Sequence, residues 1–214
     1  MIGVLGGTFD PIHFGHLRPA LEIAEILQLR ELRLIPGALP PHREQPEAEA
    51  PVRLRMVTAA AASESRFVVD DRELRRAGPS YTVDTLTSLR RELGNEAIGL
   101  VIGMDAFLHL HTWHQWQRLI ELAHFIVMQR PGIYSPELYR EKMHPEVRGL
   151  VDQRSVTELS RLHTAQCGNI WFQAVTQLDI SATKVRALVK EGKSARYLTP
   201  DTVLEIIENQ HLYR

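Results

Sequence analysis

Several features that would assign the chain to a protein class are missing. Of its 214 residues only Cys167 is a cysteine, which excludes an internal disulfide and a cysteine-rich zinc site and is typical of a reducing cytoplasm. No apolar run approaches the roughly 18 residues that a membrane span requires, and residues 1–5 lack the basic region that begins a signal peptide. We therefore expect a cytoplasmic protein that does not enter a membrane.

An excess of positive charge is also missing. The chain has 25 Lys and Arg against 26 Asp and Glu, a formal net charge of −1. This balance excludes the broad basic field of a sequence-independent nucleic-acid binder. The ordinary hydrophobic share of 44% fits a single globular domain over residues 1–214. We expect a small-molecule partner and no nucleic acid, while the oligomeric state is left open by the sequence.

Continuous apolar runs alternate with helical patterns along the chain. Apolar runs without polar alternation predict parallel strands buried on both faces, so the fold class predicted is a doubly wound, mostly parallel α/β sheet. The expected strands are 2–5, 32–35, 67–69, 98–102, 125–128 and 170–172. Residues 133–168 lack a strand pattern and predict a helical excursion. C-terminal helices are expected over 181–214, with Ser181 and Thr199 as N-caps.

The segment 6–16, between the first strand and the first helix, carries the first candidate site. Gly6 and Gly7 let the backbone approach a ligand closely. His13 and His16 lie at the mouth of the helix, where backbone N–H groups and the helix dipole favour an anion. The segment lacks GxGxxG and GK[ST] spacing, which excludes both of those phosphate-binding motifs. It indicates a phosphate site of another kind or, alternatively, a glycine-rich turn with two surface histidines.

A second candidate segment runs from Ile180 to Arg186. The hydroxyls of Ser181 and Thr183 begin a helix, and Arg186 supplies a planar fork one turn later, a donor set that suits phosphate oxygens. Alone, the segment is more typical of a capped surface helix. Together with His13 and His16 it predicts a second phosphate contact.

Residues that follow the expected strand 98–102 are candidates for binding a sugar and an aromatic ring. Asp105 can accept hydrogen bonds from ribose hydroxyls, and Gly103 allows close approach; alternatively, Asp105 N-caps the next helix. Trp113 is either a core anchor, which its chemistry alone favours, or a flat platform for an aromatic ring.

Three further groups of residues lie near the expected strand ends. The helix that begins in segment 80–86 can bind a carboxylate at its N-terminus. The long loop 36–51, with His42 and Arg43, is either a solvated loop or a lid over a phosphate. The histidines 109, 111 and 114 lack a cysteine or carboxylate partner at metal-ligand spacing, so we predict a structural or exposed cluster and no metal site.

The two phosphate motifs carry a family resemblance. Residues 13–16, His-Phe-Gly-His, and residues 180–186 resemble the (H/T)xGH and ISSTxxR-like motifs of the nucleotidyltransferase superfamily. The resemblance implies a Rossmann-like fold in which both motifs grip the triphosphate of ATP. Ala182 departs from the pattern, which has serine there.

All six segments, in this order, resemble the bacterial nicotinate-nucleotide adenylyltransferase family from Gly3 to Tyr213. The resemblance implies transfer of the adenylyl group from ATP to nicotinate mononucleotide, giving deamido-NAD and pyrophosphate. Mg²⁺ would bridge phosphates and water without dedicated protein ligands. The family loop commonly reads Pro-x-His-Lys, whereas this chain has Arg43. Other acceptors, namely nicotinamide mononucleotide or phosphopantetheine, and a non-catalytic nucleotide-binding module stay open as alternatives.

The resemblance also assigns roles to individual residues. The implied catalytic residues are His16, His13 and Arg186. The implied ATP-binding residues are Gly6, Gly7, Thr8, Phe9, His13, His16, Gly103, Asp105, Ile180, Ser181, Thr183 and Arg186. The implied acceptor-binding residues are Arg43, His42, Ser80, Tyr81, Thr82, Asp105, Trp113 and His114, with the ring stacked on Trp113 and backbone donors at Tyr81, Thr82 and His114.

Overall fold

The computed structural model describes residues 1–38, 45–129 and 137–214. Its six strands form one sheet in the order β3-β2-β1-β4-β5-β6, with every neighbouring pair parallel. The strands are β1 (Ile2–Gly7), β2 (Glu31–Pro36), β3 (Phe67–Val69), β4 (Ile98–Gly103), β5 (His124–Gln129) and β6 (Ile170–Ala174). The predicted doubly wound α/β fold is confirmed, and the sheet is parallel throughout rather than mostly parallel.

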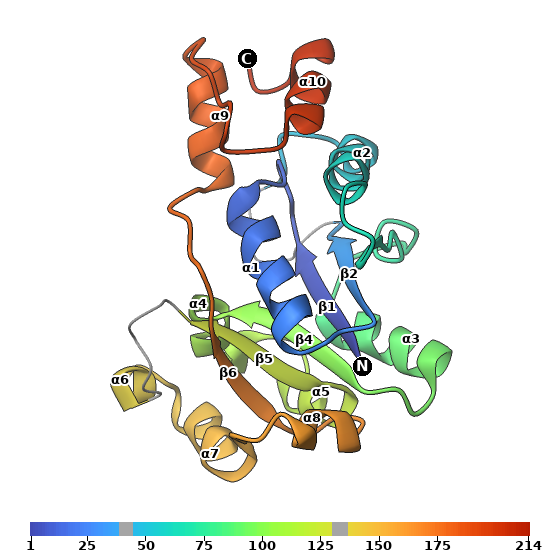
Figure 1. Cartoon of the computed structure of the whole chain (residues 1–214), viewed down its shortest axis with the longest axis vertical. Coiled ribbons are helices and arrows are strands. Elements are labelled where there is room, and N and C mark those ends of the chain that lie inside the picture. Colours follow the sequence, from blue (N-terminus) through green and yellow to red (C-terminus); the bar gives the residue numbers. More distant parts are fainter. Residues whose placement is uncertain (39–44, 130–136) are drawn as a thin grey trace.

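Helices cover both faces of the sheet and bury two separate cores (Figure 1). The first core takes apolar side chains from α1 (Phe14–Ile26), α2 (Ala50–Ala61), α8 (Ser160–Thr164), α9 (Ala182–Lys190) and α10 (Asp201–Asn209). The second takes them from α3 (Thr82–Leu93), α4 (Met104–Leu108), η1 (Leu110–Thr112), α5 (Trp116–Leu122) and α7 (Pro145–Arg154). In α3 the buried Val83, Leu86 and Leu89 recur at helical spacing, so one face of the helix packs on the sheet.

The two central strands, β1 and β4, separate before they end. Their pairing covers Ile2–Val4 and Ile98–Leu100, whereas β1 pairs with β2 along all six residues. A crevice therefore opens at the carboxyl ends of β1 and β4, where the strand order reverses. Ligands of open α/β sheets bind at this switch point.

The C-terminal helices α9 and α10 lie beyond the carboxyl end of β1 (Figure 1). Ser181 is the N-cap of α9, because its Oγ accepts a hydrogen bond from the backbone N–H of Lys184 at 3.2 Å. The prediction that Thr199 caps the last helix is wrong. Pro200 occupies the N-cap of α10, and the buried Thr199 hydroxyl donates to the Ile12 carbonyl at 2.7 Å.

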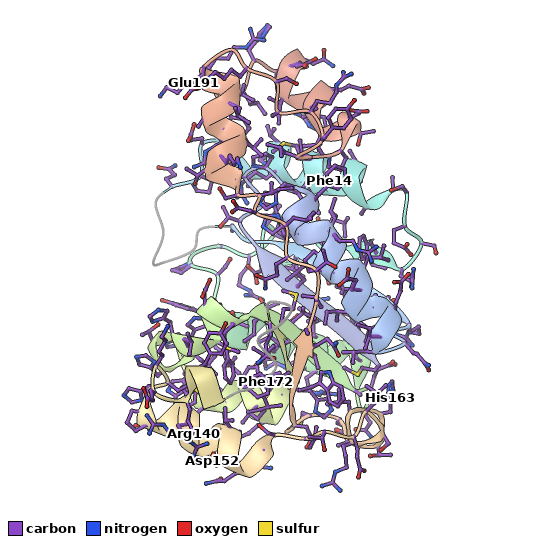
Figure 2. The ribbon with its side chains drawn as sticks, turned by 60° about the vertical axis from the view of Figure 1, so that its left-hand side comes forward. Phe14, Arg140, Asp152, His163, Phe172 and Glu191 are labelled. Carbon is purple, nitrogen blue, oxygen red and sulfur yellow. The ribbon has the colours of Figure 1, made fainter. Side chains whose placement is uncertain are left out.

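Between β5 and β6 the described residues from 137 onward form three short helices. These are α6 (Glu137–Arg140), α7 and α8. An ion pair joins the first two, with Arg140 Nη2 donating to Asp152 Oδ2 at 2.8 Å. Figure 2 shows this pair at the end of the molecule opposite Glu191, which follows α9. No described helix is both long and apolar enough to cross a membrane.

Candidate functional site

Two cavities flank the segment Gly6–Thr8 at the carboxyl end of β1, and these three residues line both of them. We call them the His16 cavity and the Trp113 cavity. The His16 cavity is lined by Gly6, Gly7, Thr8, Phe9, Asp10, His16, Gln45, Pro46, Glu47, Ala182, Thr183 and Arg186. The Trp113 cavity is lined by Val4, Gly6, Gly7, Thr8, Ile35, Gly37, Glu73, Ser80, Thr82, Thr85, Leu86, Leu100, Val101, Ile102 and Trp113.

The His16 cavity brings together the two predicted phosphate motifs, which lie about 170 residues apart in the sequence. Gly15 makes the close approach possible. A Cβ at Gly15 would lie 2.9 Å from both His13 Nδ1 and the carbonyl oxygen of Ile180, which is closer than real Cβ contacts come. Glycine is therefore required at this position so that the start of α9 can approach the start of α1.

The two histidines of the first motif form a stacked pair. Their ring centroids lie 3.8 Å apart with an interplanar angle of 28°, and the edge of Phe9 packs against His16 at 5.1 Å. The backbone N–H of His13 donates to His16 Nδ1 at 3.3 Å. Because Nδ1 accepts, a neutral His16 ring carries its proton on Nε2, so a hydrogen bond donated by this ring comes from Nε2.

His13 is the buried member of the pair, with 4% of its surface exposed. Burial lowers the pKa of His13 to about 4, because the charged ring would lose its hydration. Within the described residues its Nδ1 has no hydrogen-bond partner. His13 is therefore neutral near pH 7 and supports the ring of His16 rather than adding a positive charge.

Arg186 reaches across the His16 cavity from α9. Its Nη1 donates to the backbone carbonyl of Asp10 at 2.8 Å, and its Nε donates to Glu47 Oε1 at 2.7 Å. The guanidinium is thus held in place by two protein acceptors, and Arg186 lines the cavity. Thr183 lines the same cavity, and Ala182 occupies the position at which the motif pattern has serine.

Asp10 joins three distant segments and was not among the predicted site residues. Its buried carboxylate accepts hydrogen bonds from the backbone N–H groups of Glu47 at 2.8 Å and Ala48 at 3.1 Å, and from the Tyr213 hydroxyl at 2.7 Å. Asp10 lies within the segment 6–16, and this position could have indicated a role in the site. The carboxylate therefore ties residues 47–48, of which Glu47 lines the His16 cavity, and the C-terminal Tyr213 to the first motif.

Arg53 is a second residue that sequence reasoning missed. Its side chain is 1% exposed and donates to carbonyls in three loops, namely those of Thr8 at 2.6 Å, Gly37 at 2.8 Å and Ala48 at 3.1 Å. Burial lowers the pKa of Arg53, although the nearby Asp10 charge opposes this shift. The partners of Arg53 are backbone carbonyls, which every residue has. No sequence pattern therefore predicts these contacts.

The C-terminal segment also supports the first motif. Besides the Tyr213 hydroxyl on Asp10 and the Thr199 hydroxyl on Ile12, the carbonyl of Leu198 accepts from the N–H of Phe14 at 2.9 Å. Three hydrogen bonds between residues 198–213 and the first motif, two donated by Thr199 and Tyr213 and one accepted by Leu198, therefore hold the turn that carries His13 and His16.

The Trp113 cavity lies in the crevice where β1 and β4 part. Trp113 is half-buried; it packs against the second core, which confirms the core interpretation, and it also lines the cavity, so its role as a platform for an aromatic ring stays a prediction. Ser80 and Thr82 line the opposite wall at the start of α3. Among the described residues, no acceptor is present for the backbone N–H groups of Thr82 and Val83. These groups can bind an anion.

Tyr81 and His114 lie together at the edge of this region, with ring centroids 4.4 Å apart. The structure therefore brings the segments of the predicted backbone donors next to each other. His42 and Arg43 lie outside the described residues, so their predicted acceptor contacts stay predictions.

Gly103 ends β4 and Asp105 follows it, but neither is among the described residues that line the two cavities. The alternative prediction that Asp105 is an N-cap is wrong. Gly103 occupies the N-cap of α4, and the exposed Asp105 lies in its first turn. The proposed ribose contact of Asp105 stays a prediction.

The rings of His109 and His111 lie near each other, with centroids 6.4 Å apart, whereas His114 has another neighbour. The ring of His111 stacks on His144 with centroids 4.3 Å apart, while the ring of His114 lies against Tyr81. Over residues 1–38, 45–129 and 137–214, no group of three or more His, Cys, Asp or Glu side chains converges to hold a metal ion.

The chain is similar to known proteins over its whole length. Residues 4–188 match the family model described as Cytidylyltransferase-like. A relative from Methylococcus capsulatus named "Probable nicotinate-nucleotide adenylyltransferase" is 50% identical, over 100% of this chain and 99% of the relative. A relative of the same name from Pseudomonas syringae pv. tomato is 49% identical, over 100% of this chain and 93% of the relative.

Solved structures share the fold. Plasmodium falciparum nicotinic acid mononucleotide adenylyltransferase, solved in complex with APC and with NaAD, matches with a TM-score of 0.71 in both cases. The match covers 99% of this chain and 96% of each of those chains, at 17% and 18% identity. With the sequence relatives, the finding confirms the resemblance carried by the motifs: the chain is a nucleotidyltransferase of the cytidylyltransferase-like family and belongs to its nicotinate-nucleotide adenylyltransferases.

Proposed function

We propose that the chain transfers the adenylyl group of ATP to nicotinate mononucleotide, giving deamido-NAD and pyrophosphate in NAD biosynthesis. One observation carries the proposal: the segment Gly6–Thr8 lines both cavities. ATP phosphates in the His16 cavity and a mononucleotide in the Trp113 cavity would meet across this backbone. The acceptor phosphate would then lie next to the α-phosphorus of ATP.

The reaction is an in-line displacement at phosphorus. An oxygen of the acceptor phosphate forms a bond to the α-phosphorus, and the bond from this phosphorus to the α,β-bridging oxygen breaks. The electron pair of that bond leaves with pyrophosphate. The attacking phosphate is mostly ionised at neutral pH, so no general base is required. Catalysis then depends on positioning and on stabilising charge on the phosphate oxygens.

His16 is assigned the contact with the α-phosphate in the transition state. Its Nδ1 accepts from the backbone of His13, which leaves Nε2–H as the donating group of the neutral ring. His13 orients this ring by stacking on it. Arg186 is assigned the leaving pyrophosphate, because it lines the same cavity and its guanidinium is held there by the Asp10 carbonyl and Glu47.

Mg²⁺ enters the proposal as part of the substrate, MgATP. The carboxylate of Asp10 already accepts three hydrogen bonds from the protein. This arrangement is consistent with a metal ion that is held by phosphates and water. That binding mode is a proposal, as is the choice of Mg²⁺ over another divalent ion.

The Trp113 cavity is assigned the choice of acceptor. The pyridine ring would stack on Trp113, and its carboxylate would accept hydrogen bonds from the N-terminus of α3 near Tyr81 and Thr82. A carboxamide presents its NH₂ group to one of these donors and loses a hydrogen bond. The acid mononucleotide should therefore be preferred over the amide.

Pyrophosphate release with ATP, Mg²⁺ and a series of acceptors tests this function. Nicotinate mononucleotide should give the highest kcat/KM, nicotinamide mononucleotide a lower one, and phosphopantetheine no release above background. Equal kcat/KM for the acid and the amide would refute the acceptor assignment. ATP binding without pyrophosphate release for any acceptor would indicate a non-catalytic module.

A further inference from the structure

The Trp113 cavity contains a charged group that the proposed mechanism does not use. Of the described residues that line it, Glu73 alone has an ionisable side chain; the others are apolar, glycine or hydroxyl residues and Trp113. An acidic group is unexpected in a cavity assigned to a mononucleotide with a ring carboxylate, because two carboxylates repel each other when both are ionised.

Glu73 is held in place by its neighbours. Its Oε1 accepts a hydrogen bond from the buried Thr85 hydroxyl at 2.6 Å, and Arg76 Nη1 approaches the same hydroxyl at 3.5 Å. Its Oε2 lies near Gly37, the loop residue beyond β2, at 3.6 Å from the position of a Cβ built there. One carboxyl oxygen is thus used by α3, and the other faces a second wall of the cavity.

The turn that carries Glu73 is anchored to the sheet and to α3. Asp70 accepts hydrogen bonds from Arg72 Nε at 2.8 Å and from Arg33 Nη1 on β2 at 3.2 Å. Arg72 also donates to Glu92 on α3 at 2.6 Å. These contacts fix the position of Glu73, so a substrate in the cavity meets its carboxyl group at a defined place.

We propose that Glu73 is a specificity-determining residue that binds the acid acceptor in its protonated form, donating a hydrogen bond from its carboxyl group to the ring carboxylate. Binding of the acid acceptor is then coupled to the uptake of one proton from solvent by Glu73. An amide acceptor carries no negative charge on its ring and requires no proton. This inference rests on the proposed acceptor and concerns the same cavity.

The electrostatic surroundings favour this coupling. Burial raises the pKa of the Glu73 carboxyl, against the opposing effects of the hydrogen bond from Thr85 and the charge of Arg76; the charge of Asp70 adds to the rise. An acceptor carboxylate in the cavity would raise it further. Two further titratable side chains near the start of α3, Tyr81 and His114, lie against each other with ring centroids 4.4 Å apart.

The test compares two acceptors that share the same ribose and phosphate. Initial rates of pyrophosphate release are measured from pH 6 to pH 10 with nicotinate and nicotinamide mononucleotide, and the ratio of kcat/KM, acid over amide, is plotted against pH. In the wild type this ratio should fall as the pH rises, with a limiting slope of about tenfold per pH unit for one proton. Titration of the shared phosphate cancels in the ratio.

Variants of Glu73 test whether the pH dependence of the kcat/KM ratio arises from this residue. In Glu73→Gln the side-chain amide can still accept from Thr85 and donate to the substrate, so the ratio should be high and independent of pH. In Glu73→Ala it should be independent of pH and about tenfold lower, because the donor is lost. Glu205→Gln, an exposed α10 substitution that is remote from both cavities, should retain the wild-type slope.

A binding measurement on the wild type keeps the proposal testable if a variant fails to fold. Calorimetric titration in buffers with different ionisation enthalpies should show greater proton uptake with the acid than with the amide, by up to one proton, since any change at the shared phosphate is common to both. A flat wild-type ratio, equal uptake for both acceptors, or an unchanged slope in Glu73→Gln would overturn the role of Glu73 while leaving the acceptor assignment intact. Absence of turnover with either mononucleotide would overturn both.

Discussion

The two cavities on either side of Gly6–Thr8 are built in different ways. The His16 cavity is assembled from segments that are far apart in the sequence. The Asp10 carboxylate accepts hydrogen bonds from backbone N–H groups, and Arg53 and Arg186 donate to backbone carbonyls. The Trp113 cavity has mostly apolar walls and a single ionisable side chain, Glu73, among its described lining residues.

This difference indicates that the His16 cavity serves the phosphoryl transfer and the Trp113 cavity serves the choice of acceptor. Phosphoryl chemistry requires donors held at fixed positions, because positioning and preorganised electrostatics supply most of the rate. Acceptor choice requires shape, an aromatic surface and one or two directional contacts. A substitution in the His16 cavity should therefore change kcat or the KM for ATP and leave the KM for the acceptor nearly unchanged. A substitution in the Trp113 cavity should change the KM for the acceptor and leave the KM for ATP nearly unchanged.

The largest effect is expected for His16→Ala. Loss of a donor to a transition-state oxygen lowers kcat by about two to three orders of magnitude, roughly 3–4 kcal/mol. The KM values for ATP and the acceptor should change little, since the contact is assigned to the transition state. Steady-state kinetics measures both, and an unchanged kcat would remove His16 from the mechanism.

The next effect concerns stability rather than rate. The folded-state pKa of His13, about 4, lies below the ordinary 6.5, so the unfolded chain binds this proton more readily. The contribution of neutral His13 to stability is present above pH 6.5 and is lost as the pH falls towards 4, by roughly 3 kcal/mol.

Urea unfolding at pH 7.5 and pH 4 measures this loss. His13→Gln should show a smaller decrease in the free energy of unfolding over this interval. His124, whose pKa burial also lowers, is present in both proteins, so the difference between them isolates His13. Parallel pH dependences in the two proteins would show that His13 is not buried in its neutral form.

Trp113→Ala tests the assignment of acceptor binding to the Trp113 cavity. Loss of the stacking platform should raise the KM for nicotinate mononucleotide by about tenfold, since stacking on an aromatic residue contributes roughly 1–3 kcal/mol. The KM for ATP should stay within about twofold. Trp116→Ala, in the same core but outside the cavity lining, is the matched control. An equal rise in both KM values would mean that the two cavities do not act separately.

The smallest effect is expected for Tyr213→Phe, which removes one buried hydrogen bond to Asp10. The unfolding free energy should fall by about 1 kcal/mol. The KM for ATP should rise several-fold while the KM for the acceptor is unchanged, since Asp10 orients the His16 cavity. Tyr197→Phe, at a residue that is 82% exposed, should change neither quantity. An unchanged KM for ATP would limit Tyr213 to a structural role.

The sequence predicted the elements whose signals are local. Continuous apolar runs such as residues 98–102 predicted the buried parallel strands, and helical spacing predicted α3 and its buried face. The two predicted phosphate motifs line one cavity, as the resemblance implied, while their contact with phosphate stays a prediction. Thr199 shows the limit of such signals: its hydroxyl could cap a helix, yet it bonds to Ile12.

The residues that hold the site together were beyond prediction. Arg53 donates to backbone carbonyls, and Tyr213 reaches Asp10 over about 200 residues, so neither contact has a sequence signature. Glu73 lies in a charged stretch, 70–76, that resembles an exposed turn. Its place in the Trp113 cavity follows from tertiary packing against Thr85.

The most direct test of this account is the structure of the ternary complex with a non-hydrolysable ATP analogue, Mg²⁺ and nicotinate mononucleotide. The account predicts the α-phosphate beside His16 and the pyridine ring on Trp113, with the ring carboxylate at hydrogen-bond distance, about 2.7–3.2 Å, from backbone N–H groups at the start of α3. A pyridine ring in the His16 cavity, or a triphosphate that does not contact His16 and Arg186, would contradict it.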